Sequence, residues 1–174
     1  MKAIAEGKFD TYINKWATQA HKFGNPFYIR FGHEMNDPYR DPWWPKNNKP
    51  VEFIAAWKHV ISRFKAMGTS NVIWVWTPHP GYTNYAEYYP GNDCVDFIAT
   101  TALNYGSVVQ WSKWYSFDES FGKFCKDFSF YGKPIMITEF GTLSVGGDRA
   151  KMVQRSTGAV SSKISNGETL IVFP

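Results

Sequence analysis

Apolar positions along the chain follow two periods, which together predict an alternation of helices and strands. Over residues 7–23, apolar side chains recur at spacings of three and four, which is typical of an amphipathic helix. Gly24 and Pro26 follow this segment, and both residues are typical of a helix end. The helical period also predicts helices over residues 50–67, 117–130 and 148–164.

Short runs of aromatic and β-branched residues lie between these helices and predict strands. The runs are Phe27–Phe31, Asn71–Trp76, Val95–Thr101, Ile135–Thr138 and Leu170–Phe173. Strands that alternate with helices imply a parallel sheet built from right-handed crossovers. A nucleotide-binding sheet has the same order, but the sequence has neither G-x-G-x-x-G after a strand nor G-x-x-x-x-G-K-[ST], which such folds use to bind phosphate.

The length of the chain limits how much of a barrel it can form. The sequence has 174 residues, whereas a complete (β/α)8 barrel needs about 250 residues. We therefore expect an α/β fold in which about five parallel strands with alternating helices form a partial (β/α)8 TIM barrel. We expect one domain over residues 1–174.

Polar side chains gather where two of the predicted strands end. Arg30, His33, Glu34 and Asn36 lie at the end of FYIRFGHEMN. Glu139 follows the apolar run of PIMITEFG. Because catalytic groups of a parallel α/β barrel sit at the carboxyl ends of the strands, we expect the two glutamates to face one site.

Two carboxyl groups that flank one bond are the chemistry of glycoside hydrolysis. Trp43 and Trp44 follow Glu34 and would favour its protonated form by excluding water, which suits the acid. Arg30 would keep Glu139 ionised from the neighbouring strand, which suits the nucleophile. The alternative is that both glutamates are surface residues paired with Lys or Arg. The lone histidines His21, His59 and His79 are more typical of structural roles.

Composition points to a sugar as the ligand. Aromatic residues make up 18% of the chain and include eight Trp; some of these fill the core, and exposed aromatic faces suit sugar rings. The net charge is +4 with Lys and Arg scattered, so we expect no nucleic-acid partner. The two cysteines lack metal-ligand spacing, and we expect no metal and no cofactor. The first residues show no signal peptide, and no apolar run approaches a membrane span.

These stretches resemble glycoside hydrolase family 26, which comprises endo-acting β-mannanases and related β-glucanases on a (β/α)8 barrel. The matching segments fall in order along most of the chain. They are RFGHEMN at Arg30–Asn36, NVIWVWTP at Asn71–Pro78, YYPGNDCVDFI at Tyr88–Ile98, NYG at Asn104–Gly106, GKPIMITEFG at Gly132–Gly141 and GGDRAK at Gly146–Lys151.

The resemblance implies a role for each residue that matches the family pattern. Glu34 would be the acid/base and Glu139 the nucleophile of a retaining double displacement. His33 would contact the sugar in the −1 subsite, and Tyr105 would hold the carboxylate of the nucleophile. Residues that would line the cleft are Trp43 or Trp44, Trp76 and Trp111.

The resemblance also implies which part of the barrel is present and what it acts on. The strands resemble strands 4 to 8, with strands 1 to 3 absent before Met1, as in a truncated catalytic domain. The loop over residues 37–50 departs from the mannanase pattern. β-1,4-Mannan is the favoured substrate, with β-1,3/1,4-glucan or xylan as alternatives. Other classes are a non-catalytic carbohydrate-binding domain and a glycan-processing domain tied to polysaccharide synthesis. Because polymeric β-glycans lie outside the cell, we expect a secreted protein.

Overall fold

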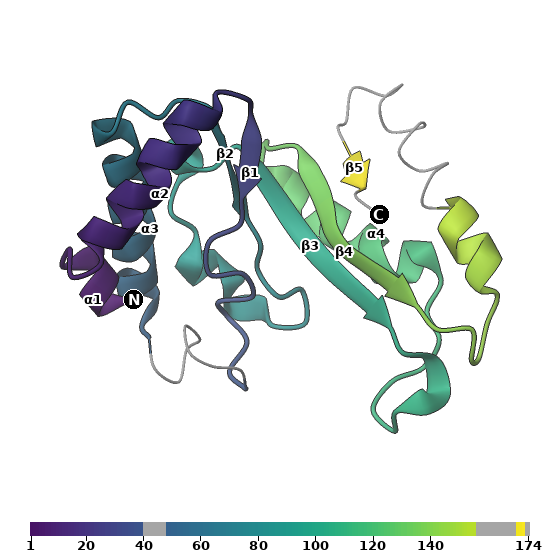
Figure 1. The fold of residues 1–174 in the computed structure, drawn as a ribbon. Helices are drawn as coiled ribbons and strands as arrows, with labels where there is room; N and C mark the ends of the chain where they lie inside the picture. Colours follow the sequence, from purple (N-terminus) through teal and green to yellow (C-terminus); the bar gives the residue numbers. More distant parts are fainter. Residues whose placement is uncertain (40–47, 156–169, 173–174) are drawn as a thin grey trace. The chain divides into compact units, whose positions relative to one another are not determined.

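The predicted alternation of helices and strands is present in the computed structural model of the chain, which describes residues 1–39, 48–155 and 170–172 (Figure 1). The chain divides into two compact units, Met1–Phe97 and Ile98–Pro174, which we call the first and the second unit. The described strand pairs within each unit are parallel. No helix in the described part of the chain is both long and apolar enough to cross a membrane.

The first unit is a parallel strand pair with its helical connections. Its elements are α1 (Lys2–Ala5), α2 (Asp10–Phe23), β1 (Phe27–Ile29), α3 (Pro50–Ala66), β2 (Val72–Trp76), and the 3₁₀ turns η1 (Thr83–Tyr88) and η2 (Asn92–Cys94). Phe27 pairs with Val72 and Ile29 with Trp74. Helix α2 ends where Gly24 adopts a φ of 73° and its N–H donates to the Ala20 carbonyl. Glycine adopts this left-handed conformation without the steric penalty that a side chain brings.

The core of the first unit forms between α3 and β2. Phe53, Trp57 and Phe64 lie on one face of α3 and are buried. The Trp74 ring of β2 packs edge-on against Trp57 and Phe64, with centroid distances of 6.3 and 5.4 Å. Trp57 also donates from Nε1 to the Cys94 carbonyl at 3.0 Å. Full burial of each large apolar side chain contributes roughly 2–3 kcal/mol, so this contact fixes α3 on the strand pair.

The second unit repeats the same plan. Its elements are β3 (Phe97–Asn104), η3 (Gly106–Val108), α4 (Phe117–Phe128), η4 (Ser129–Tyr131), β4 (Ile135–Thr142) and β5 (Leu170–Val172). Strand β4 pairs in parallel with both β3 and β5. Helix α4 buries a stripe of phenylalanines at helical spacing, namely Phe117, Phe121, Phe124 and Phe128. This stripe is the apolar face that the sequence period predicts.

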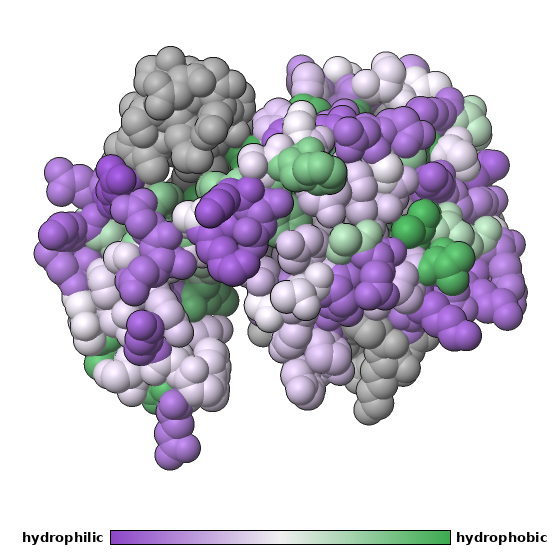
Figure 2. All heavy atoms as spheres, turned by 180° about the vertical axis from the view of Figure 1, so that it is seen from behind, coloured by the Kyte–Doolittle hydropathy of each residue, from purple (hydrophilic) through white to green (hydrophobic). Residues whose placement is uncertain are grey.

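Most of the described surface in Figure 2 carries polar side chains. Hydrophobic residues form only small separate areas on this face of the molecule. Such scattered apolar exposure is ordinary for a folded surface.

The start of the chain and the first strand differ from the predicted boundaries. Helix α1 was not predicted, because its four residues are too few to show a period. The strand predicted over Phe27–Phe31 ends at Ile29. Residues 31–36 form turns instead, with Gly32 at a φ of 56°.

Two strands of the second unit are longer than predicted. Strands β3 and β4 continue to Asn104 and Thr142, because the two strands stay paired through these ends. Of the helix predicted over residues 148–164, residues 149–155 are helical and residues 156–164 lie outside the described residues. The α/β class and the parallel pairing are as predicted.

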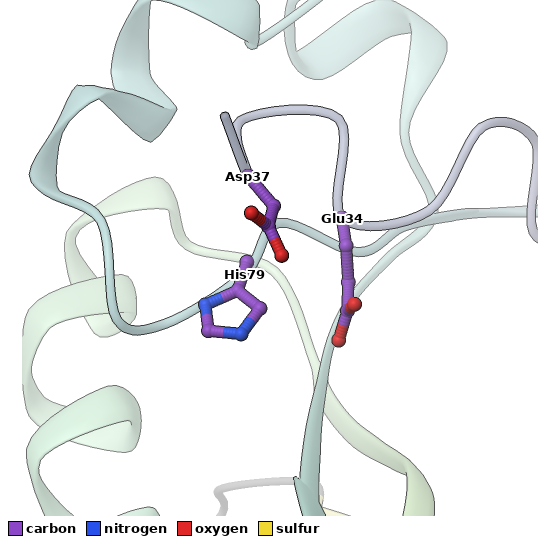
Figure 3. A group of neighbouring side chains, drawn as sticks. All are labelled: Glu34, Asp37 and His79. Atoms are coloured by element: carbon purple, nitrogen blue, oxygen red, sulfur yellow. The ribbon is translucent and has the colours of Figure 1, made fainter. Parts of the chain in front are cut away.

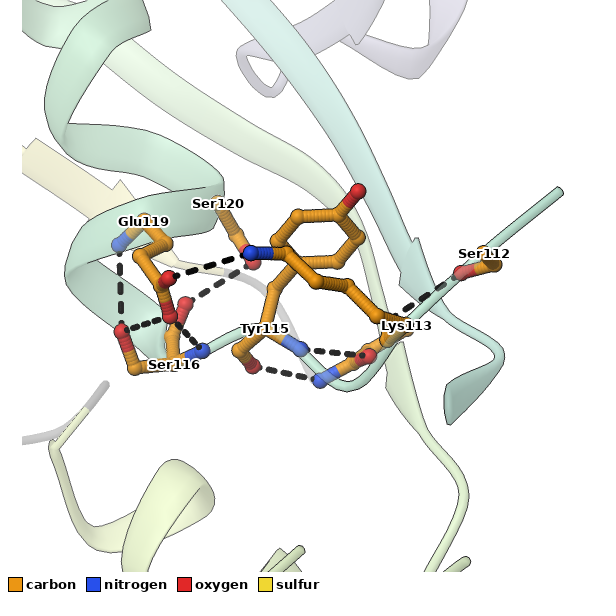
Figure 4. Close-up of polar contacts among 7 residues, drawn as sticks. Ser112, Lys113, Tyr115, Ser116, Glu119 and Ser120 are labelled. Atoms are coloured by element: carbon orange, nitrogen blue, oxygen red, sulfur yellow. Dashed lines mark hydrogen bonds and ion pairs between the residues drawn. The ribbon is translucent and has the colours of Figure 1, made fainter. Parts of the chain in front are cut away.

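Helix α4 begins with a reciprocal cap (Figure 4). The Ser116 hydroxyl accepts from the Glu119 N–H at 3.3 Å, and Glu119 Oε2 accepts from the Ser116 N–H at 2.8 Å and from its hydroxyl at 2.7 Å. The backbone donor and then the hydroxyl lower the pKa of Glu119 from its ordinary value of 4.5, and Lys113 adds to the effect. The stabilisation is therefore present above pH 4.5 and lost as the pH falls through the lowered pKa.

We expect Ser116→Ala to lower the free energy of unfolding by about 1 kcal/mol at pH 7, because two helix-end groups lose their partner. The difference from wild type should be smaller at pH 3 than at pH 7, because the stabilisation is lost as the pH falls toward and through the lowered pKa of Glu119. Urea denaturation at both pH values measures it. Ser62→Ala, at an exposed position of α3, is the control, and its free energy of unfolding should stay within about 0.5 kcal/mol of the wild-type value. A loss of equal size at pH 3 and pH 7 would contradict the role of the Glu119 charge.

Candidate active site

Glu34 lies in the turn that follows β1 and has a strained backbone. Its φ is 55°, and it is the one residue other than glycine with a positive φ among the residues described. The side chain is 6% exposed, and its N–H donates to the Thr77 carbonyl at 2.7 Å. A left-handed conformation in a residue with a Cβ costs about 1–2 kcal/mol. Such strain persists where the surroundings enforce it, and it is concentrated at functional sites.

Asn36 ties this turn to the loop that follows β2. Its Nδ2 donates to the carbonyls of His79 and Tyr82 at 3.0 and 3.1 Å, and its Oδ1 accepts from the His79 N–H at 2.7 Å. The side chain is 1% exposed. Both ends of the amide therefore bind the backbone. These contacts suit a role in holding the turn that carries Glu34 rather than direct contact with a substrate.

Asp37 and His79 lie beside Glu34 and form a cluster with it (Figure 3). One side-chain atom of each residue lies within 4.8 Å of the other two. Asp37 is 4% exposed, and its Oδ1 accepts from the Tyr39 N–H at 2.9 Å. His79 Nδ1 accepts from the Gly81 N–H at 3.0 Å. A carboxyl group at this position is thus surrounded by groups that can exchange or share a proton.

Glu139 lies on β4 in the second unit, where the strand pairing is irregular. Its Cα partner on β3 is Thr101, and the register shifts between Thr100 and Thr101. The hydroxyl of Thr138 donates to the Thr100 carbonyl at 3.2 Å. A register shift re-aims the side chains beside it, and such irregularities are common next to active sites. Glu139 is partly exposed.

Aromatic residues follow β3 in the same unit. The Tyr105 and Trp111 rings meet edge-on with centroids 5.4 Å apart, and Trp111 is 75% exposed. Buried Asn104 holds the end of this loop, since its Nδ2 donates to the Tyr115 carbonyl at 2.6 Å and its Oδ1 accepts from the Tyr115 N–H at 3.2 Å. The loop therefore exposes the Trp111 ring, while its end is held in place by the hydrogen bonds to Asn104.

The other residues singled out from the sequence have different environments. Arg30 and His33 are partly exposed after β1, and Arg30 lines a hollow together with Trp16 and Tyr28. Trp76 is 0% exposed, with its ring 4.9 Å from that of Tyr89. This differs from the expected place in a cleft wall, because a side chain without exposed surface supports a wall from behind. Trp43 and Trp44 lie outside the described residues.

Comparison with known proteins gives the family. Residues 4–120 match the sequence model of Glycosyl hydrolase family 26. The chain belongs to this family. The match includes the Glu34 turn and the loop after β2, and it ends before Glu139.

Individual proteins match more of the chain. Endoglucanase H of Acetivibrio thermocellus is 30% identical over 165 residues, which cover 90% of this chain and 18% of that protein. The catalytic domain of a Bacillus sp. JAMB-750 endo-β-1,4-mannanase has a TM-score of 0.70 at 17% identity over 96% of this chain and 47% of that one. A modular endo-β-1,4-mannanase from Cellulomonas fimi has a TM-score of 0.69 at 16% identity over 96% of this chain and 40% of that one.

The structural likeness confirms the predicted fold class, a partial (β/α)8 barrel. The chain spans about half the length of these solved structures and about a fifth of the curated relative. In this family 26 chain, each unit carries one of the two glutamates at or near the carboxyl end of its strands. Asp37, His79 and Asn104 were not predicted as site residues. Asp37 directly follows the HEMN motif, which is the one local signal that pointed to it.

The strain at Glu34 gives a prediction with an unusual sign. We expect Glu34→Gly to be more stable than Glu34→Ala by about 1 kcal/mol, because glycine adopts the positive φ freely. Urea unfolding at constant m-value measures the difference. The control is the exposed helix position Lys15, where glycine should be less stable than alanine by about 1 kcal/mol. If alanine is the more stable residue at both positions, the backbone at Glu34 is not strained.

Proposed function

We propose that this chain is part of the catalytic domain of a retaining endo-acting glycoside hydrolase that cleaves β-1,4-mannan. The observation that carries the proposal is Glu34, a buried carboxyl group on a strained backbone in a chain of family 26. Strain of this kind is kept where a side chain must be held in one orientation. In the proposal, Glu34 is the acid/base and Glu139 is the nucleophile.

The two carboxyl groups divide the reaction between them. Glu34 donates its proton to the glycosidic oxygen as the bond to the anomeric carbon breaks, and the Glu139 carboxylate bonds to that carbon. Glu34 then takes a proton from water, which displaces Glu139 and restores both groups. Two inversions leave the configuration of the product unchanged. This course needs the carboxyl groups about 5–5.5 Å apart.

Other residues have supporting roles in the proposal. Arg30 and His33 lie in the turn beside Glu34 and would contact sugar hydroxyls or the nucleophile. Tyr105 would hold the Glu139 carboxylate, and exposed Trp111 would stack on a sugar ring. Trp43 and Trp44 would line the cleft near Glu34. Asn36 and Trp76 would shape the site from behind. We also propose that the protein is secreted, because its polymeric substrate lies outside the cell.

A second candidate substrate is a β-1,3/1,4-glucan. It is favoured by the relative named Endoglucanase H, which at 30% identity is nearer in sequence than the mannanases at 16–17%. The mannanases resemble this chain in fold, whereas the endoglucanase resembles it in sequence. The loop over residues 37–50 also departs from the mannanase pattern. The two candidates share the mechanism and differ in the sugar that the cleft accepts.

The roles of the glutamates can be tested by amide substitution. We expect Glu34→Gln to lower kcat/KM on polysaccharide by about 10²–10⁴-fold, because general acid catalysis contributes that much. Its effect on kcat/KM should be small for aryl glycosides whose leaving group needs no proton, because this constant covers only the steps up to the covalent intermediate, before Glu34 acts as a base. Glu139→Gln should abolish turnover on both substrates, because no covalent intermediate forms. Glu6→Gln, at an exposed residue that follows α1, is the control. Equal losses of Glu34→Gln on both substrates would rule out the acid role.

The substrate can be tested with the purified enzyme on β-1,4-mannan and mixed-linkage β-glucan. We expect the higher kcat/KM on mannan. Proton NMR of the newly formed products should show that they keep the β-configuration. A higher value on glucan would move the assignment to the second candidate. Binding of either polymer without any hydrolysis, unchanged by Glu34→Gln, would instead identify a carbohydrate-binding domain.

A further inference from the structure

His79 and Asp37 are the groups nearest to Glu34 that the proposed mechanism leaves without a role. They come from different segments, since Asp37 follows the Glu34 turn and His79 lies in the loop after β2. One ligand atom from each of these two side chains and one from Glu34 lie within 4.8 Å of one another. Asp37 N–H also donates to the Glu34 carbonyl at 3.0 Å, so the two carboxyl groups share one turn.

The surroundings of His79 fix its orientation and the place of its proton. Nδ1 accepts from the Gly81 N–H, so in the neutral ring the hydrogen is on Nε2. Asn36 binds both the N–H and the carbonyl of His79, and the Tyr82 ring packs against the imidazole at 4.9 Å. In Figure 3, the ring nitrogen farther from the main chain is on the side of the Glu34 carboxyl group. The imidazole therefore carries its N–H on the nitrogen that lies on the Glu34 side of the ring.

A metal ion is the other ligand that this set of side chains suggests. A metal would need the lone pair of Nε2, and hence a hydrogen on Nδ1. That hydrogen would meet the Gly81 N–H, so two donors would face each other. Asp37 Oδ1 is already an acceptor for the Tyr39 N–H. The hydrogen bonds favour a donor role for His79 over a metal site.

We propose that His79 is a positioning residue for the proton transfer by Glu34, an inference that rests on the proposed function. When the proton has moved to the glycosidic oxygen and the bond to the anomeric carbon has broken, the His79 Nε2–H donates to the new Glu34 carboxylate. His79 keeps its proton throughout.

Two substitutions of His79 separate the donor from the fold of the loop. His79→Asn places an oxygen near Nδ1 for the Gly81 N–H but removes the donor that faces Glu34. His79→Gln places an amide N–H near Nε2. On polysaccharide we expect His79→Asn to lower kcat about ten- to hundredfold with little change in KM, since a hydrogen bond to a charged group is lost. We expect His79→Gln to keep most of the activity.

Leaving-group dependence distinguishes positioning from a structural role. With 2,4-dinitrophenolate as leaving group, the His79→Asn variant should keep a kcat/KM close to that of wild type, because that group leaves without a proton and kcat/KM covers only the steps up to the covalent intermediate. A matched control is His59, which contacts the Asp10 carboxylate at 2.6 Å elsewhere in the first unit. His59→Asn should leave the activity on both substrates unchanged. Equal losses on both substrates, or equal activity of His79→Asn and His79→Gln on polysaccharide, would overturn the inference.

The outcome is separable from that of the proposed function. If Glu34→Gln shows no leaving-group dependence, the proposed function fails. If Glu34→Gln shows it and His79→Asn does not, only the present inference fails. A readout that needs no turnover is ¹⁵N NMR of the labelled protein, with the His79 signals assigned by their loss in His79→Asn. We expect the Nε2–H form, and a hydrogen on Nδ1 would overturn the inference.

Discussion

The hydrogen bonds between the Glu34 turn and the loop after β2 hold the first unit in the form that the candidate site needs. Three involve the side chain of Asn36, and a fourth joins Glu34 N–H to the Thr77 carbonyl. At about 1 kcal/mol each, four such bonds outweigh the roughly 1–3 kcal/mol of a left-handed residue. The strained conformation of Glu34 is therefore a consequence of how two neighbouring parallel strands are joined at their carboxyl ends.

The second unit uses the same type of residue in the same way. Asn104 ends β3, is buried, and binds the N–H and the carbonyl of Tyr115. An asparagine side chain carries one acceptor and two donors on a short stem, so it can pair with a loop backbone as another strand would. Asp lacks the donors, and an unsatisfied buried backbone group costs about 1–3 kcal/mol. Each unit thus uses a buried asparagine to hold a loop that carries residues of the candidate site.

The sequence predicts the elements better than it predicts the site. Apolar spacing and strand composition are local properties, so helices α2, α3 and α4 and all five strands could be predicted within a few residues. The strand-end rule also placed Glu34 and Glu139 correctly on or just after their strands. The positive φ of Glu34 could not be predicted, because no glycine stands there and the strain is imposed by contacts from residues 77 to 82. His79 was assigned a structural role for the same reason, since its partners are distant in sequence.

Packing beneath the turn explains why these contacts hold Glu34 in one position. Phe31 stacks on Phe53 at 6.3 Å and tilts against Trp57 at 6.0 Å, so the turn begins on the core of the first unit. A Cβ at the next residue, Gly32, would lie 3.0 Å from the Phe53 ring, and the φ there is 56°. The turn is therefore fixed from below by apolar contacts and from the side by Asn36. A carboxyl group held in this way has little freedom to follow the substrate. Catalytic groups must be placed within about 0.5 Å, so in the proposed mechanism substitutions at Phe31, Gly32 or Asn36 would act on proton transfer through the position of Glu34.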